Sequence, residues 1–207
     1  MKNWVAKYNL EVLTFVLGTF IVCAVALYPT LSIIQRFMIA FMWLFVLHEW
    51  EEGKYPGGFV DLMAKNLLKM DVSQETANLS RIPTMILIMS FTVVPFFFDT
   101  VWLLVLLPVY LSIFEGIVHV AGIKLFKLKR PYTPGLVTAL AEFAVGIGCL
   151  AYLITSCPIA LWEYLVAVVL YFACFAFMQS RLTKLVGIKY REFPKMMRTR
   201  IKEMHGR

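Results

Sequence analysis

The chain has 207 residues, of which 60% are hydrophobic and only 16% are charged, and its formal net charge is +7. A soluble domain carries about 25% charged residues, so these values exclude a typical soluble enzyme and predict a single integral membrane domain. Loops beside a membrane explain the excess of lysine and arginine, which makes nucleic-acid binding a poor interpretation.

Six apolar runs are each long enough to cross a bilayer, which takes about 20 residues in a helix. Turn residues at Pro29, Asp99 and Pro158 separate consecutive runs. Connections this short predict antiparallel hairpins of neighbouring helices. The predicted fold class is therefore all-α, an integral membrane bundle of six transmembrane helices within residues 1–185. The predicted spans are 9–28, 31–50, 81–98, 100–126, 134–156 and 159–185.

The positions of lysine and arginine predict the orientation, because cytoplasmic loops are enriched in both. Nineteen of the twenty lie in the N-terminus, the loops 51–81 and 124–130, and the segment from Arg181 onward, whereas Arg36 lies on the other side. Both termini are therefore expected to be cytoplasmic in a multi-pass protein of the plasma or inner membrane. Residues 186–207 are expected to form a basic cytoplasmic tail attracted to anionic membrane lipids.

The loop 51–81 is patterned as a helix. Asp61, Lys65 and Lys69 form a polar stripe at helical spacing, and apolar residues cover the remaining faces. This pattern predicts an amphipathic helix in the cytoplasmic interface. It is either an ordinary connection or a lid through which a substrate reaches the membrane domain.

The second run ends in the motif His48-x-x-Glu51-Glu52. On a helix with 3.6 residues per turn, Glu51 and Glu52 lie about one turn beyond His48, whereas Glu49 is expected to point away. An imidazole and two carboxylates therefore share one face. A divalent metal ion or a proton relay would use this arrangement.

Two later runs also contain ionisable residues, which cost at least about 2.5–3.5 kcal/mol each at the centre of a bilayer. Glu115 and His119 are four residues apart and share a helix face. Glu142 lies about two turns into the fifth run. With the predicted orientation, these residues and His48 fall at similar depths, so we expect one polar layer in the cytoplasmic leaflet.

Imidazole and carboxylate ligands suit zinc, iron or manganese. A single metal ion would leave a position for water, and a remaining glutamate could act as general base. The expected metal ligands are His48, Glu52 and His119. The expected catalytic carboxylates are Glu51, Glu115 and Glu142, of which Glu51 could also be a ligand and the other two could support the ligands or a second metal ion.

This pattern predicts a metal-dependent membrane enzyme, either a hydrolase or an oxidoreductase, acting on a lipid or another apolar small molecule. A transporter or proton-coupled permease could use the same carboxylates to store protons. The chain is short for a large aqueous pathway, an objection that a homodimer would remove. In a third interpretation the polar side chains only fix helix packing in a non-catalytic scaffold.

The loop before the fifth run contains basic and helix-starting residues. Thr133 and Pro134 suit the N-cap and first turn of that helix. A helix N-terminus beside Lys129 and Arg130 suits a phosphate group, so a lipid head group is one expected ligand. A capped helix after a basic loop is the simpler interpretation. The expected head-group residues are Lys129, Arg130, Tyr132 and Thr133.

The motif that begins at His48 and a second element, His119 followed by Tyr132-x-Pro134-Gly135, resemble the HXXEE-domain family. Its members are small multi-pass membrane proteins of unknown function. The resemblance covers roughly residues 40–150. The residues that match the family are His48, Glu51, Glu52 and His119. It supports a site at these positions and leaves the chemistry open, whereas the roles of the carboxylates in the fourth and fifth runs rest on spacing alone.

Overall fold

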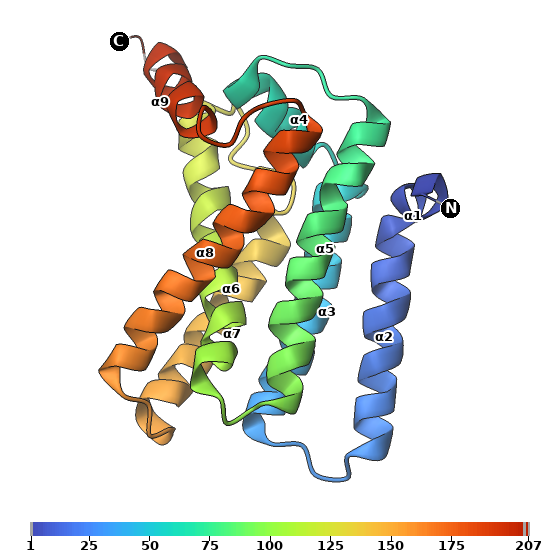
Figure 1. The fold of residues 1–207 in the computed structure, drawn as a ribbon, viewed down its shortest axis with the longest axis vertical. Coiled ribbons are helices and arrows are strands. Elements are labelled where there is room, and N and C mark those ends of the chain that lie inside the picture. The colour runs from blue at the N-terminus through green and yellow to red at the C-terminus, as the bar shows by residue number, and fades with distance from the viewer. Residues whose placement is uncertain (1, 205, 207) are drawn as a thin grey trace.

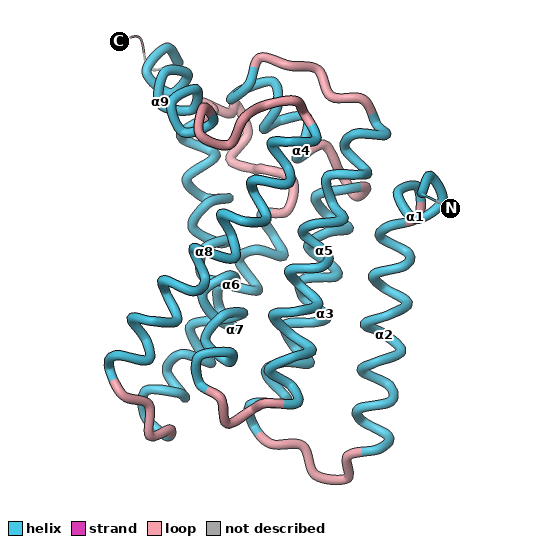
Figure 2. Tube along the Cα trace, viewed as in Figure 1, coloured by secondary structure: helices cyan, strands magenta, loops and turns pink. Residues whose placement is uncertain are grey.

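The computed structural model describes residues 2–204 and 206, and within them every regular element is a helix (Figure 1; Figure 2). The third histidine of the chain, His205, lies outside the described residues. The elements are α1 (Lys2–Lys7), α2 (Asn9–Leu27), α3 (Ile33–Gly53), α4 (Phe59–Met63), the π-helix η1 (Ala64–Leu68), α5 (Gln74–Phe97), α6 (Trp102–Leu125), α7 (Leu136–Ser156), α8 (Leu161–Leu185) and α9 (Phe193–Met204).

Six of these helices, α2, α3 and α5 to α8, are long and apolar enough to span a membrane. They confirm the six predicted runs, although several boundaries differ. Helix α3 extends to Gly53 and so includes the whole acidic motif. Helix α5 begins at Gln74, earlier than predicted, because the Ser73 hydroxyl caps it by accepting the N–H of Thr76 at 3.2 Å.

The long helices form one bundle with both ends of the chain at the same end (Figure 1). Helix α3 packs against α2, α5 and α7, while α6 packs against α7 and α8, and α8 also contacts α5. The largest fully buried side chains include Phe41 and Phe45 of α3 and Leu106 of α6. The three tight connections lie at the opposite end, so the long loops and the acidic motif share the end where the chain begins and finishes (Figure 1).

Glycine allows α6 and α7 to approach closely. A Cβ atom on Gly116 would lie 2.7 Å from the Phe143 side chain, and one on Gly146 would overlap the hydroxyl of Ser112. Small residues of this kind let helix backbones approach inside a membrane domain. The close contact fixes the height of α6 relative to α7, and therefore the relative positions of their polar residues.

The predicted interfacial helix is shorter than its sequence pattern suggested, and consists of α4 followed by η1. Its polar stripe is exposed and Ala64 and Leu67 are buried, so the predicted amphipathic character is confirmed. The C-terminal segment forms α9, which packs on η1. Arg200 Nε donates to the backbone oxygen of Asn66 at 2.8 Å, and Lys69 Nζ lies 2.9 Å from Glu203 Oε2.

Candidate metal centre

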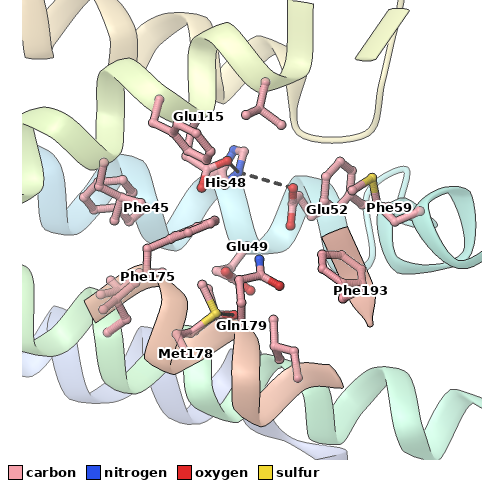
Figure 3. A pocket seen from close by; sticks show the side chains of 18 of the residues that line it. Phe45, His48, Glu49, Glu52, Phe59, Glu115, Phe175, Met178, Gln179 and Phe193 are labelled. Carbon is pink, nitrogen blue, oxygen red and sulfur yellow. Dashed lines mark hydrogen bonds and ion pairs between the residues drawn. The ribbon is translucent and has the colours of Figure 1, made fainter. Parts of the chain in front are cut away.

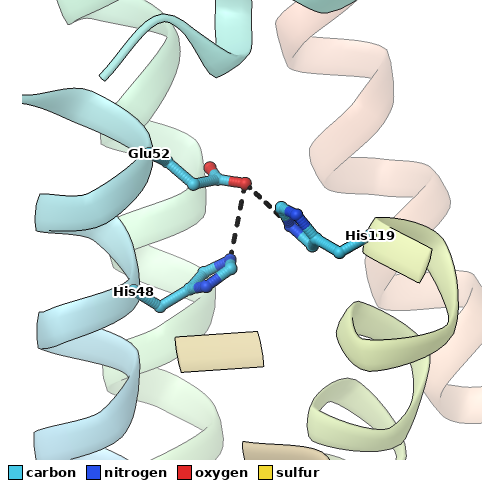
Figure 4. Close-up of side chains that lie close together, drawn as sticks. All are labelled: His48, Glu52 and His119. Carbon is cyan, nitrogen blue, oxygen red and sulfur yellow. Dashed lines mark ion pairs between the residues drawn. The ribbon is translucent and has the colours of Figure 1, made fainter. Parts of the chain in front are cut away.

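Three of the predicted ligands meet near one end of the bundle (Figure 4). His48 and Glu52 are one turn apart on α3, and His48 Nε2 lies 3.4 Å from Glu52 Oε1. From α6, His119 Nε2 lies 3.1 Å from the same oxygen. The three ligand atoms lie within 4.8 Å of one another. The predicted His48–Glu52–His119 cluster therefore forms, and it could hold a metal ion.

A threonine hydroxyl lies beside the Nδ1 atom of each imidazole. Thr138 Oγ1 donates to Glu51 at 2.6 Å and lies 3.0 Å from His48 Nδ1. A hydroxyl has one proton to donate, so this short bond favours an Nδ1–H group on His48 that donates to Thr138. Thr133 Oγ1 lies 2.9 Å from His119 Nδ1 and 3.3 Å from the backbone oxygen of His119. With an Nδ1–H group on His119 as well, both Nε2 lone pairs would point toward Glu52.

Two nitrogen lone pairs facing a carboxylate oxygen require a cation between them, either a proton or a metal ion. His119 is fully buried, and its Nε2 atom has no hydrogen-bond partner among the described residues. Ligand bonds to zinc measure about 2.0–2.2 Å, so neighbouring ligand atoms of a tetrahedral site are about 3.4 Å apart. The observed separations of 3.4 and 3.1 Å match this spacing. These two separations suit a bound metal ion, and all three ligand atoms lie within 4.8 Å of one another.

Glu115 brings a second carboxylate to the same nitrogens. Its Oε2 atom lies 3.8 Å from His119 Nε2 and 4.0 Å from His48 Nε2. Its side chain is 21% exposed, in contrast to the fully buried His119. It is therefore slightly too distant to complete the inner group of ligands, and close enough to act on a molecule bound there.

Glu142 reaches this layer from α7. Its side chain is fully buried, and Oε1 lies 4.0 Å from His48 Nδ1. Neither carboxylate oxygen has a hydrogen-bond partner in the described part of the chain. A buried polar group without a partner is costly. Helices α3, α6 and α7 thus all contribute ionisable side chains to one compact group.

Glu51 has a different position from the one expected for a ligand or base, because its carboxylate caps α7. Oε1 accepts hydrogen bonds from the Tyr132 hydroxyl at 2.8 Å and the Val137 N–H at 3.2 Å. Oε2 accepts from both the N–H and the hydroxyl of Thr138, at 2.8 and 2.6 Å. A carboxylate at a helix N-terminus is stabilised by the unpaired N–H groups there. The hydrogen-bonding capacity of Glu51 is therefore used for positioning.

The predicted start of the fifth helix was wrong by about two residues. Helix α7 begins at Leu136 with Gly135 as its N-cap, and Thr133 points to His119 instead of capping the helix. Burial and the hydrogen bond to Glu51 raise the pKa of Tyr132 to about 12, so this hydroxyl stays protonated as a donor.

The four residues expected to bind a lipid head group do not lie together. Lys129 and Arg130 are exposed in the loop. Tyr132 and Thr133 turn inward and hold Glu51 and His119 respectively. The N–H groups of Val137 and Thr138, which a phosphate would have used, are bound by Glu51. The structure therefore separates an exposed basic pair from two residues that contact the His/Glu cluster.

Gly135 makes the closest backbone approach to the cluster. Its φ angle is +95°, which favours glycine. A Cβ atom there would lie 2.6 Å from His119 Cε1, 2.7 Å from Glu52 Cγ and 2.9 Å from His48 Cε1. Only glycine therefore fits beside the three ligands. Its place in the Tyr132-x-Pro134-Gly135 element was the one sequence signal for this position.

The cluster opens on a cavity of about 380 Å³ with mostly apolar walls (Figure 3). Phe45, Phe114 and Phe175 line its interior, while Phe59 stacks on the His119 ring at a centroid distance of 4.9 Å and covers the cluster. Helices α4 and α9 contribute further lining residues and so cover this end of the cavity.

The prediction that Glu49 points away from the site was wrong. Glu49 is 3% exposed and lines the same cavity as His48, together with Gln179 of α8 (Figure 3). Its position one residue after His48 turns it by about 100°. That direction would face solvent or lipid on a helix covered on one side only, but α3 also packs against α5, and Gln179 of α8 borders the same cavity, so Glu49 faces the interior as well.

An all-helical chain with six candidate membrane-spanning helices and a buried His/Glu cluster suggests a multi-pass membrane protein. The chain belongs to the family described as "protein of unknown function with HXXEE motif", which matches residues 39–151. This range confirms the resemblance that the motif predicted, and it contains the whole cluster. Comparisons with curated proteins and with solved structures found no match.

Proposed function

We propose that this protein is a metal-dependent membrane hydrolase that acts on a lipid or another apolar substrate. The observation that carries the proposal is the convergence of two imidazole nitrogens and a carboxylate oxygen within 4.8 Å of one another, where the buried His119 Nε2 atom has no hydrogen-bond partner among the described residues. Two histidines and one carboxylate are a common ligand set for zinc and for non-haem iron.

Each residue near the centre has a separate role in this proposal. His48, Glu52 and His119 hold the ion. Zinc, iron and manganese all suit this ligand set, and the bound ion would supply a Lewis acid and a more acidic water molecule. Glu115 is the general base, because it faces both ligand nitrogens without being one of the closest donors. This second carboxylate favours hydrolysis over oxidation, since a water molecule held there needs a proton acceptor.

Glu51 acts through other residues. Through Thr138 it fixes the tautomer and orientation of His48, while Thr133 does the same for His119. Such contacts commonly orient metal-binding histidines and tune their basicity. We therefore assign Glu51 a positioning role and leave proton transfer to Glu115.

The apolar walls of the cavity support a lipid-like substrate. His48 lies five residues before the end of α3, His119 six before the end of α6, and Glu142 six after the start of α7. At 1.5 Å per residue, each lies about 8–9 Å from the helix end. With the chain termini in the cytoplasm, this depth corresponds to the cytoplasmic leaflet.

Metal analysis of purified protein tests the proposal. After incubation with zinc, iron or manganese and removal of excess ion, we expect about one tightly bound ion per wild-type chain and almost none in His48→Ala or His119→Ala. The exposed Glu11 provides a control, and Glu11→Gln should bind as the wild type does. A wild-type protein that folds but retains none of the three metals would overturn the proposal.

A proton relay is the second candidate, and the unpartnered Glu142 favours it. In that case a proton occupies the space between His48, Glu52 and His119, and Glu142 exchanges protons with His48 at 4.0 Å. Proton flux into proteoliposomes that is abolished by Glu142→Gln, from protein without bound metal, would support this function. A homodimer would then supply the wider pathway that one chain lacks. A scaffold role would leave all these variants equivalent to the wild type.

A further inference from the structure

A second hollow lies on the outside of the bundle between α5 and α8. This groove has a volume of about 640 Å³ and is bordered mainly by apolar side chains. Ile86 and Phe177, two of its residues, are 56% and 61% exposed. Because both helices are candidate membrane spans, an apolar groove at this position faces the hydrocarbon of a bilayer.

The outer groove and the inner cavity share a wall. Leu87 of α5 and Met178 of α8 line both spaces, and each is less than 9% exposed. Met178 packs in the buried apolar core, and its sulfur atom lies 4.0 Å from the Thr84 hydroxyl. Methionine is unbranched and adapts its conformation easily. Rotation of this one side chain would connect the two spaces.

We propose that the acyl chain of a membrane lipid occupies the outer groove and reaches the inner cavity by passing between Leu87 and Met178. The continuity of the two apolar spaces at this pair of residues is the main argument. Met178 lies seven residues before the end of α8, close to the depth of His48 in its own helix. The route is thus lateral, from the cytoplasmic leaflet directly to the His/Glu layer.

The charge at the edge of the groove fits the same occupant. Arg181 lines the groove one turn beyond Met178, toward the end of α8, and its guanidinium lies 4.6 Å from the centre of the Phe177 ring. An arginine this close to a helix end lies near the membrane surface, where its charge is tolerated. A lipid whose chain lies in the groove therefore has a cation beside its phosphate or carboxylate.

This inference rests on the proposed function only for what happens at the end of the route, since chain binding requires no metal ion. The test uses metal-free protein in liposomes that contain phosphatidylglycerol with a photoactivatable diazirine in one acyl chain. After illumination, labelled peptides are identified by mass spectrometry. We expect labels both on the groove face of α5 and α8 and on inner-cavity residues such as Phe45 and Phe114.

Met178→Trp should fill the passage, so that inner labelling falls by about tenfold while groove labelling persists. Met178→Ala should widen the passage and increase inner labelling. Val169→Trp is the matched control, because Val169 is 69% exposed on the same helix and borders neither space; it should change neither signal.

Two results would overturn the inference: a folded wild type labelled only in the groove, and inner labelling that is the same in the wild type and both Met178 variants. The outcome is independent of metal binding. Inner labelling in a protein that binds no metal would retain the lipid route and remove the metal-dependent hydrolase. Metal binding without inner labelling would retain the metal-dependent hydrolase and remove the lipid route.

Discussion

Acidic side chains at the two ends of the bundle have different surroundings. At the end with the tight turns, Asp99 accepts a hydrogen bond from Ser32 at 2.6 Å, and Glu163 caps α8 by accepting the N–H of Ala160 at 2.8 Å. At the other end, Glu142 is fully buried without a hydrogen-bond partner among the described residues, and Glu52 faces two imidazoles. The first pair stabilises helix ends, whereas the second group retains binding capacity that the fold does not use.

Glu51 shows that this difference follows from local geometry and not from which end of the bundle is involved. It belongs to the same motif as Glu52, yet it caps α7 by accepting two backbone N–H groups, as Glu163 caps α8 by accepting one. The adjacent residues Glu51 and Glu52 on one helix therefore have different roles. One fixes the start of a neighbouring helix, and the other faces the cavity.

The largest expected effect comes from removing the negative charge of a carboxylate in the cluster, compared with the same change at the opposite end of the bundle. Glu52→Gln should reduce metal affinity by more than about a hundredfold, because an amide is a poor substitute for a carboxylate ligand. Asp99→Asn, the matched change at the opposite end, should leave affinity unchanged. Titration of metal-free protein with zinc measures both. Equal affinities in the two variants would show that the ends do not differ in this way.

The hydrogen bonds behind the ligands are expected to have the next largest effect. Thr138→Val removes the hydroxyl that links His48 to Glu51, and metal affinity should fall by about 10- to 100-fold. Thr155→Val is the control on the same helix. Thr155 lies near the opposite end of α7, where its hydroxyl bonds to the backbone oxygen of Ala151 and lies beside the Ser156 hydroxyl. Zinc affinity that is unaffected by Thr138→Val would contradict the assigned His48 tautomer.

A pair of glycines separates backbone strain from crowding. Gly135 and Gly58 have φ angles of +95° and +93°, but a Cβ atom would meet the three ligands at Gly135 and nothing within 4 Å at Gly58. Both alanine variants should therefore carry similar strain. Gly135→Ala should lose a further 1–3 kcal/mol, roughly, in the free energy of unfolding because of overpacking. Denaturant unfolding in detergent measures the difference, and equal losses would argue against close packing at the centre.

The smallest expected effect concerns the contact between α9 and the end of η1. The hydrogen bond from Lys69, together with Arg200, holds the pKa of the Glu203 carboxyl below its usual value. The stabilisation that the ionised Glu203 carboxylate gives to this contact is therefore complete above the usual carboxyl pKa, and it is lost as the pH falls through the lowered value. Hydrogen exchange in η1 should increase over that acidic range, after correction for the intrinsic rate.

Glu203→Gln should remove this pH response of η1. Glu192 is also exposed, and Glu192→Gln is the matched control that should retain the response. An unchanged response in Glu203→Gln would show that another group holds α9 on η1. Helices α4 and α9 cover the inner cavity, so hydrogen exchange in η1 also measures how firmly this cover is held.

Much of the fold and the ligand cluster could be predicted because helical periodicity is local. Hydrophobic runs predicted the six long helices, and the spacing of His48 and Glu52 placed both on one face. His119 could be matched to them in depth once the helices were assumed to alternate in direction. Its 3.1 Å approach to Glu52 agrees with that expectation.

The sequence by itself determined the helices and the residues available for a site, because both depend on neighbours within one or two turns. The tertiary structure decided what each residue does. Only the start of α7 against α3 makes Glu51 a cap and Gly135 a close neighbour of the ligands. Only the packing of α5 and α8 on that side of α3 makes Glu49 face the interior. These roles depend on contacts between segments far apart in the chain, which local spacing does not encode.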